Sequence, residues 1–327
     1  MNSYIITGGS GFVGNVLIKE LLAQQHTQEI INIDLVKSTH DSPMIKNFVY
    51  DITNINDLHK LSSSLSGQYK IFHLAANIFN DMVPRKSKRK SFFFNTNVQG
   101  TQNLLDCIHP SCIESISFLS TDMVYGYPRN IPIEEINSLK PNGEYGDSKV
   151  EAEKIIINFC QNNNLHYTIF RPRLIIGPGR FGLLNKLFFL IKNNLPVPLI
   201  GDGSNRYQFI SVFDCVNALL ESITPKANSG IYNLGSLNPP TTYELLENLI
   251  HKSNSGSRLV KTHPLLIKKT LSLLDALNLS LMYPEQFLIA DKDYVLSIEK
   301  LTKELGYEPK FNDLDMLLAA YEVYLNT

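Results

Sequence analysis

A tyrosine and a lysine at positions 145 and 149 are the residues whose types and spacing most directly suggest chemistry. Four positions apart on a helix, their side chains project from one face. A phenol with a pKa of about 10 is a poor base at neutral pH, but an adjacent ammonium group stabilises the phenolate and lowers that pKa. The pair therefore predicts that Tyr145 exchanges a proton with a substrate hydroxyl, although an exposed helix surface can also carry this pattern by chance.

A glycine-rich turn, Thr7-Gly8-Gly9-Ser10-Gly11-Phe12-Val13-Gly14, follows the first predicted strand. Its glycines permit a tight turn, close approach of a pyrophosphate to the backbone, and close packing of helix on strand. The following helix directs its amides and positive dipole end at the phosphates. The turn therefore predicts dinucleotide binding, with cofactor contacts from Gly8, Gly11, Phe12, Val13 and Gly14.

Asp34 ends the second predicted strand, 20 positions after Gly14. A carboxylate at that point accepts hydrogen bonds from both ribose hydroxyls and repels a 2′-phosphate. We therefore expect NAD as the cofactor. Lys37 nearby leaves NADP open.

The elements that must position these residues alternate along the first half of the chain. Short, nearly continuous apolar runs are typical of parallel strands covered on both faces. Such strands are predicted at Ser3–Thr7, Glu29–Asp34, Asn47–Tyr50, Lys70–Ala75, Ser115–Ser120 and His166–Arg173, with helices at Val13–Gln24, Asn97–Ile108 and Tyr145–Asn162. The alternation predicts an α/β fold, a doubly wound parallel (Rossmann) sheet.

The alternation weakens after position 173. We expect an NAD-binding domain over 1–176 and a smaller, mainly substrate-binding cap over 177–327, with one or two segments within about 207–235 returning to the sheet.

Composition excludes several classes of protein. With 30 basic and 31 acidic side chains among 327 residues, no global field attracts nucleic acid. The four cysteines lack metal-ligand spacing and are too few for a disulfide scaffold, so we expect free thiols and no metal. No signal peptide and no long apolar run is evident, and a cytoplasmic protein is expected.

Further motifs match a known family. They are Asp51-Ile52, His73-Leu74-Ala75-Ala76, Asn97-Val98-Gln99-Gly100-Thr101, Ser120–Gly126, Tyr145-Gly146-Asp147-Ser148-Lys149, Arg171–Gly179, Gly201–Asp214 and Glu304-Leu305-Gly306-Tyr307. With the glycine turn, they make the chain resemble, over essentially its whole length, an extended short-chain dehydrogenase/reductase of the NAD-dependent epimerase/dehydratase group.

The resemblance implies roles for individual residues. Tyr145 would be the acid/base, Thr121 would hold the substrate oxygen, and Lys149 would also bind the nicotinamide ribose. Asp51 and Ile52 would contact the adenine, and Leu74, Ala75 and Ala76 would line the cofactor groove. Asn97 would support the loop beside the nicotinamide, and Pro172 would pack near the nicotinamide ring.

Met123 bears on the reaction. Sugar-nucleotide 4,6-dehydratases of the family carry Thr-Asp-Glu where this chain has Thr121-Asp122-Met123, and a thioether cannot take a proton from carbon. Dehydration is therefore not expected. Oxidation followed by reduction needs only Thr121, Tyr145 and Lys149, which suits a 4-epimerase. A reductase or dehydrogenase of a ketosugar or of a 3β-hydroxysteroid-like alcohol is the alternative, and a silent NAD sensor is disfavoured by the intact catalytic set.

The predicted substrate is a nucleotide- or diphosphate-linked sugar. The loop Gly201–Arg206 is similar to the one that holds a nucleoside diphosphate in this family, and Arg206, an obligate cation with forked donors, is the expected contact. Arg180 offers a second cation with a weaker claim. Leu174 stands where UDP-sugar epimerases carry an asparagine, and it favours the hydroxysteroid-type alternative.

Two segments remain open. Arg85–Lys90, five cations in six residues, is expected to be a solvated loop, or else a clamp on a diphosphate or an anionic membrane. Leu265–Met282 carries a helical stripe at 267, 271, 274, 277 and 281, expected to pack in the core or a dimer. No membrane span is predicted, although peripheral contact is possible. Apolar residues at 155–157 and 159 predict a homodimer through the helix that holds Tyr145.

Overall fold

Seven parallel strands form the central sheet, in the order β10-β6-β5-β4-β1-β2-β3. The computed structural model describes residues 1–79, 83–182, 184–224, 227–280 and 282–327. The strands are β1 (Asn2–Thr7), β2 (Thr27–Asp34), β3 (Ile45–Val49), β4 (Tyr69–His73), β5 (Ile113–Leu119), β6 (His166–Pro172) and β10 (Gly230–Leu234). The order reverses direction between β1 and β4, and a doubly wound sheet binds ligands outside the carboxyl ends of the strands at such a point.

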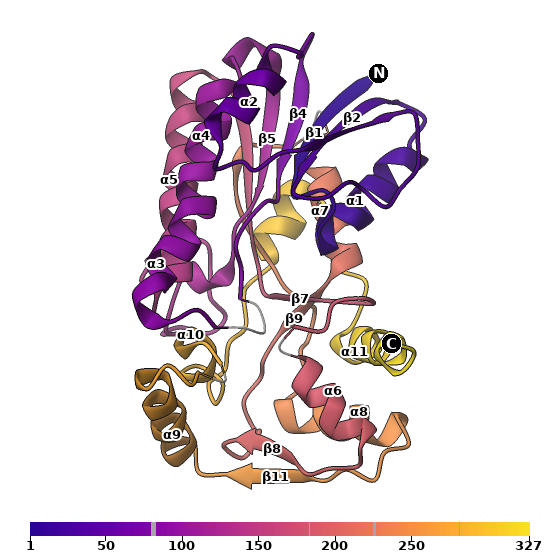
Figure 1. Cartoon of the computed structure of the whole chain (residues 1–327). Coiled ribbons are helices and arrows are strands. Elements are labelled where there is room, and N and C mark those ends of the chain that lie inside the picture. Colours follow the sequence, from indigo (N-terminus) through magenta and orange to yellow (C-terminus); the bar gives the residue numbers. More distant parts are fainter. Residues whose placement is uncertain (80–82, 183, 225–226, 281) are drawn as a thin grey trace.

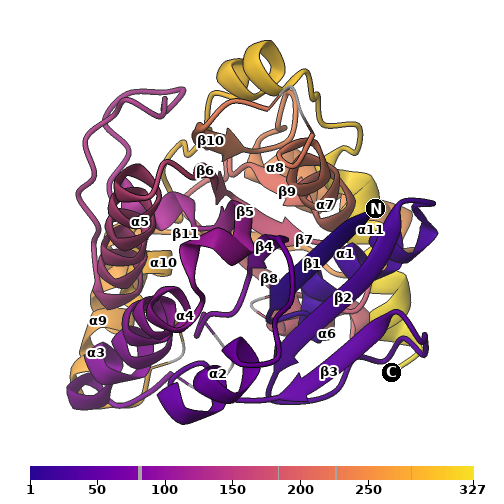
Figure 2. The same cartoon turned by 90° about the horizontal axis from the view of Figure 1, so that it is seen from above.

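Helices cover both faces of the sheet, as Figure 2 shows from above. On one face lie α1 (Phe12–Ala23) and α7 (Val212–Glu221), whose buried side chains include Leu17, Ile18 and Val216. On the other lie α2 (Ile55–Ser62), α4 (Thr101–Cys107) and α5 (Glu144–Asn162). Burial on both faces explains the nearly continuous apolar character of the strands, and the predicted Rossmann fold is confirmed.

The cap lies below the sheet in Figure 1. It contains α6 (Leu184–Lys192), β8 (Val197–Ile200), α8 (Thr242–Lys252), β11 (Leu259–Thr262), α9 (Pro264–Ala276), α10 (Pro284–Phe287) and α11 (Asp313–Leu325). Two short strands, β7 (Leu174–Ile176) and β9 (Phe209–Ser211), pair where the chain passes between sheet and cap. The chain therefore crosses to the cap after β6 and returns through α7 and β10, which is the edge strand of the sheet.

The basic run is helical, which corrects the loop expected there. It forms the first part of α3 (Lys86–Phe94), and Arg85, Lys86, Lys88 and Lys90 are exposed. Arg89 is buried instead and holds α9: its guanidinium donates to both carboxylate oxygens of Asp275 at 2.5 and 3.2 Å.

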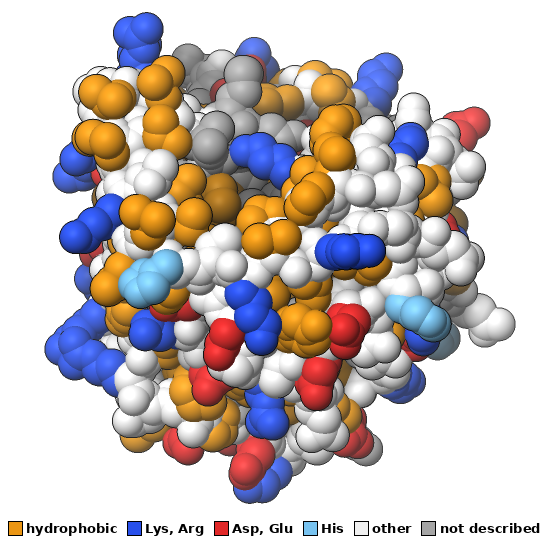
Figure 3. Space-filling model, turned by 90° about the horizontal axis from the view of Figure 1, so that it is seen from below, with side chains coloured by type: hydrophobic (Ala, Val, Ile, Leu, Met, Phe, Trp, Pro, Cys, Tyr) orange, Lys and Arg blue, Asp and Glu red, His pale blue; other side chains and the backbone are white. Residues whose placement is uncertain are grey.

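The stripe expected on α9 is partly buried at Ile267, Leu271 and Leu274, whereas Leu277 is 60% exposed, so its packing in the core or a dimer stays a prediction. Outside that stripe, Leu265, Leu266 and Leu273 are each between 62% and 65% exposed, whereas Asp275 is buried. Figure 3 shows the molecule from below, with hydrophobic side chains on the left, the side on which α9 lies, and Lys and Arg side chains along the left edge. Position 281 of the predicted stripe lies outside the described residues. Within the described ranges, no helix is long and apolar enough to cross a membrane.

The buried Arg89–Asp275 pair gives a stability prediction. Replacing Arg89 with Leu leaves the Asp275 carboxylate buried without its counterion, and we expect the free energy of unfolding to fall by about 3–5 kcal/mol. Urea unfolding measures the change. The control is Lys88→Ala, at an exposed position of the same helix, expected to lie within about 0.5 kcal/mol of wild type. An equally small effect of Arg89→Leu would show that the pair does not hold α9.

Candidate active site

The glycine turn brings β1, α1 and the end of β4 unusually close together. Gly8 has φ +73°, and a Cβ there would lie 2.7 Å from the backbone nitrogen of Ala75. A Cβ on Gly14 would lie 2.3 Å from the carbonyl oxygen of Gly8. Neither position can hold a side chain without backbone movement, so the turn leaves the amino end of α1 open beside the strand ends.

Asp34 is fixed at the end of β2 by two backbone groups. Its carboxylate accepts hydrogen bonds from the amides of Ser10, at 2.9 Å, and Leu35, at 2.7 Å. The side chain also lines the cavity beside the turn. The carboxylate therefore lies beside the turn at a strand end, the position expected of a group that recognises ribose hydroxyls.

A cavity of about 640 Å³ runs along the carboxyl ends of the strands, a size typical of small-molecule and cofactor sites. Most of the predicted site residues line it. They are Gly8, Gly11, Phe12, Val13, Gly14, Asp34, Asp51, Ile52, Leu74, Ala75, Ala76, Thr121, Tyr145, Lys149, Pro172 and Arg180. Asn97 and Arg206 are not among the residues that form its wall.

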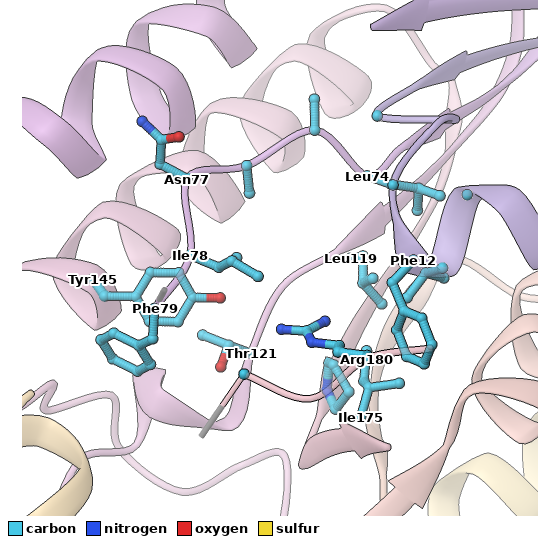
Figure 4. A pocket seen from close by; sticks show the side chains of 18 of the residues that line it. Phe12, Leu74, Asn77, Ile78, Phe79, Leu119, Thr121, Tyr145, Ile175 and Arg180 are labelled. Carbon is cyan, nitrogen blue, oxygen red and sulfur yellow. The ribbon is translucent and has the colours of Figure 1, made fainter. Parts of the chain in front are cut away.

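Tyr145 and Thr121 face the same part of the cavity, shown close up in Figure 4. Tyr145 belongs to the first turn of α5, and Thr121 follows β5, where its hydroxyl accepts a hydrogen bond from the amide of Met123 at 3.3 Å. The Tyr145 ring packs against Phe79, with ring centroids 4.6 Å apart, and against Phe93 at 5.4 Å. Packing on both rings fixes the direction of the phenol.

Lys149 is buried one helical turn beyond Tyr145. Its ammonium donates to the carbonyl oxygen of Leu119 at 2.7 Å and lies 4.0 Å from the centre of the Phe118 ring. Burial lowers the pKa of Lys149 to about 7, although the Glu153 carboxylate opposes the shift. The amine is therefore poised to change its protonation state near neutral pH.

The surroundings of Tyr145 shift the pKa of its phenol in opposite directions. Burial raises its pKa, whereas the contact with Thr121 and the positive charge of Arg180 lower it. Figure 4 shows the Arg180 guanidinium directed across the cavity toward Tyr145 and Thr121. Arg180 thus acts on the phenol as a second cation beside the predicted Lys149.

Asn97 lies behind the cavity wall. Its side chain accepts from the amide of Asn77 at 2.8 Å and donates to the Asn77 carbonyl at 3.0 Å and to the Ser148 hydroxyl at 2.9 Å. It therefore ties the loop after β4, which lines the cavity, to the helix that carries Tyr145 and Lys149.

Arg206 does not line the cavity, so the substrate contact expected of it stays a prediction. Its amide donates to Asp293 at 2.7 Å and its carbonyl accepts from the amide of Tyr294 at 2.9 Å, leaving the side chain exposed. Neighbouring side chains of an extended segment point to opposite sides, and Tyr207 faces the cavity instead. Arg180 is therefore the predicted substrate cation that the structure places in the wall.

Sequence reasoning missed an ion pair in the cavity wall. Asp122 and Arg173 form a buried salt bridge, and the Arg173 guanidinium lies between the rings of Tyr207 and Tyr294, 4.3 and 4.2 Å from their centres. The pair follows β5 and β6, which are neighbours in the sheet. Its positions at two adjacent strand ends were the signal that could have found it.

These features define a class of protein. A doubly wound sheet with a glycine turn at the point of reversal, and a tyrosine and lysine one helical turn apart in the same cavity, are the architecture of a short-chain dehydrogenase/reductase. Among the described residues, no cluster of His, Cys, Asp or Glu could hold a metal ion.

Comparison with known proteins agrees. Residues 4–235 match the sequence model of the NAD dependent epimerase/dehydratase family. The chain is 31% identical to the uncharacterized protein y4nG of Sinorhizobium fredii, over 98% of this chain and 78% of that protein. It is 25% identical to the dTDP-glucose 4,6-dehydratase of Streptomyces griseus, over 98% and 93%. The protein belongs to the NAD dependent epimerase/dehydratase family, and it is an NAD-dependent enzyme.

A solved structure shares the fold of the whole chain. The UDP-glucose 4-epimerase of Thermotoga maritima, solved with UDP-glucose, has a TM-score of 0.80 at 21% identity and covers 100% of this chain and 99% of its own. The similarity therefore extends through the cap as well as the sheet.

The residues present fit NAD. The glycine cradle has no room for side chains, so the amino end of α1 is open to a pyrophosphate, and the Ser10 amide of the same turn holds the Asp34 carboxylate beside it. The apolar residues Ile52, Ala75 and Ala76 line the same cavity.

Proposed function

We propose that this enzyme epimerises a nucleotide-diphosphate or diphosphate-linked sugar at carbon 4, by transient oxidation to a keto sugar and reduction on the opposite face. The relatives named as a nucleotide-sugar dehydratase and an epimerase support a nucleotide-sugar substrate. The choice between their reactions depends on the residues after Thr121.

The observation that carries the proposal is the absence of a free acid in the segment 121–123. Met123 lines the cavity and has no ionisable proton. Asp122 is already engaged: its carboxylate pairs with Arg173 and accepts from the Thr121 hydroxyl at 3.2 Å. This segment therefore offers neither of the two acids that would assist elimination of water, whereas Thr121, Tyr145 and Lys149 suffice for oxidation and reduction.

The mechanism assigns a proton to each step. NAD, which the glycine turn and Asp34 would hold, would supply the acceptor and donor of a hydride. In its phenolate form, Tyr145 takes the proton from the sugar hydroxyl at its phenolic oxygen, and the phenol so formed returns that proton to the sugar oxygen during reduction. Thr121 orients that oxygen. The positive charge of Arg180 stabilises the phenolate against the effect of burial. Lys149, one helical turn along α5, is proposed to act in the same direction.

The test combines cofactor content with product analysis. The purified protein is desalted and denatured, and the released NAD and NADH are measured per chain. It is then incubated with UDP- and dTDP-hexoses, whose 4-epimers are resolved by chromatography. Retained NAD and interconversion of 4-epimers without added cofactor support the proposal. Release of a 4-keto-6-deoxy sugar would overturn it.

An oxidoreductase of a ketosugar or of an apolar alcohol is the second candidate. Leu174 lines the cavity together with Ile78, Phe79 and Phe181, and these side chains suit an apolar substrate. A dehydrogenase must exchange its cofactor at every turnover, whereas an epimerase need not. Protein purified without NAD that turns over only with added cofactor would favour this candidate.

Arg180 is the proposed diphosphate contact, because it is a cavity cation with no salt-bridge partner within 4.0 Å among the described residues. We expect Arg180→Ala to weaken binding of UDP to the NAD-loaded enzyme about ten- to a hundredfold, as for loss of a charge-assisted hydrogen bond. Arg258→Ala, at an exposed position outside the cavity wall, is the control and should leave affinity within about twofold. Calorimetry gives both values.

A parallel titration of the cofactor-free protein with NAD completes this test. Weaker NAD binding by Arg180→Ala with unchanged UDP binding would reassign the guanidinium to the cofactor.

The homodimer expected through α5 stays a prediction. Ile155, Ile157 and Phe159 are partly buried against the core of the same chain, which reduces the apolar surface they could offer to a second copy.

A further inference from the structure

The amino end of the catalytic helix lacks a capping side chain of its own. The residue before α5 is Gly143, so no side chain at the N-cap position accepts from the first amides. Those amides belong to the turn that carries Tyr145. Their partner determines how firmly the phenol is held.

The partner is a carboxylate that lies 140 positions further along the chain. Glu285, in α10 of the cap, accepts from the amide of Tyr145 at 3.1 Å through one oxygen and from the amide of Gly146 at 3.2 Å through the other. Its side chain is buried, with the residue 4% exposed. A Cβ on Gly143 would lie 2.4 Å from this carboxylate, so the glycine makes room for it.

Residues on either side of Glu285 connect the same segment to the cavity. Tyr283 packs on Phe79 with ring centroids 4.5 Å apart, and Phe79 packs in turn on the Tyr145 ring. Gln286 lines the cavity. The α10 segment thus contacts the backbone of the catalytic turn, the aromatic packing around its phenol, and the space in which ligands bind.

We propose that Glu285 is a positioning residue for the reaction: it replaces the missing N-cap of α5 and fixes the turn that aims Tyr145 at the substrate. The proposal rests on the acid/base role proposed for Tyr145. Gln286 follows Glu285 directly and lines the cavity. A substrate that displaced Gln286 would therefore also move the carboxylate that holds the catalytic turn.

The environment of Glu285 indicates that the negative charge of its carboxylate does not stabilise the folded protein. Burial raises the pKa of Glu285 to about 7; the two amides lower it, and the carboxylates of Glu144 and Asp147 on α5 raise it further. The folded protein therefore holds this proton more tightly than the unfolded chain does. Through this group, folding stability falls as pH rises from about 4.5 to about 7.

The test compares Glu285→Gln with Asp147→Asn. Both changes remove one carboxylate near the first turn of α5, but Asp147 is exposed and accepts from neither of the two amides that Glu285 holds. In the NAD-loaded enzyme we expect Glu285→Gln to lower kcat about tenfold, as for a slightly misplaced catalytic group, with KM within about twofold. Asp147→Asn should keep both parameters within about twofold.

Two further measurements separate positioning from folding. Hydrogen exchange at the Tyr145 and Gly146 amides should quicken at least about tenfold in Glu285→Gln and not in Asp147→Asn, because one acceptor oxygen becomes a donor amide. The thermal unfolding midpoint should be unchanged or higher in Glu285→Gln. A kcat equal to that of the Asp147 variant, or unchanged exchange, would overturn the positioning role.

Failure of the proposed function would look different. If Tyr145→Phe retains full activity, the acid/base assignment fails whatever Glu285 does. If Tyr145→Phe keeps only a small residual rate, adding Glu285→Gln to this variant should not lower that rate further, because no phenolic proton remains to be positioned. An additional tenfold loss in that background would show that Glu285 acts elsewhere.

Discussion

Replacing Tyr145 with Phe is expected to lower kcat by about 10³-fold or more while NAD stays bound. The exchange removes only the phenolic oxygen, which is the atom proposed to accept and return the substrate proton, and general acid–base catalysis contributes up to about 10⁴-fold. Phe retains the ring that packs on Phe79 and Phe93, so the helix should keep its place. Single-turnover kinetics, followed through the absorbance of the reduced cofactor, isolate the chemical step.

The control for this prediction is Tyr127→Phe. Tyr127 is partly exposed, and its hydroxyl donates to the carbonyl oxygen of Leu288 at 3.0 Å, outside the cavity wall. Loss of that oxygen should leave kcat within about twofold of wild type. Near-normal turnover by Tyr145→Phe would exclude Tyr145 as the acid/base and would direct attention to Lys149, the other titratable group of the predicted set.

Sequence alone could predict the half of the site that follows strands. The turn after β1, Asp34 after β2 and Thr121 after β5 are each fixed by a local pattern, because the carboxyl ends of parallel strands meet at one edge of the sheet. Tyr145 and Lys149 needed their helical spacing together with the glycine turn, Asp34 and Thr121, because the spacing alone also occurs on exposed helix surfaces. Residues that depend on such local geometry lie together in the cavity.

The remainder depends on contacts between distant segments. Arg206 and Tyr207 are adjacent in the chain, and a shift of one residue in an extended segment decides which of them faces the cavity. Arg89 lies in a run of exposed cations and is distinguished from them only by Asp275, which is 186 positions away.

Glu285 is the extreme case, since nothing in its local sequence indicates a role at the amino end of α5. The role of Glu285 is apparent only together with Gly143. Gly143 has no side chain that could cap α5 or fill the space before it, and Glu285 places its carboxylate there. A glycine at an N-cap position is a weak signal, because glycine is tolerated there for its own backbone freedom.

Replacing Gly14 with Ala should abolish tight NAD binding. The added methyl would lie 2.3 Å from the Gly8 carbonyl oxygen and 2.5 Å from the Gly9 Cα, and both neighbours are backbone that cannot rotate away. Relief requires α1 to move from the turn, at a cost of about 1–3 kcal/mol for overpacking. Because the same movement withdraws the amides proposed to hold the pyrophosphate, we expect at least about tenfold weaker binding by calorimetry.

Gly256→Ala provides the matched change away from the cavity. A Cβ there would lie 3.3 Å from the side chain of Asn194 in the cap, and that side chain can yield slightly. This variant should bind NAD as the wild type does, so any general effect of a glycine-to-alanine exchange is removed from the comparison. Wild-type NAD affinity in a folded Gly14→Ala protein would mean that the pyrophosphate does not lie on this turn. The ribose contact proposed for Asp34 would then fail with it, because the Ser10 amide of the same turn holds that carboxylate.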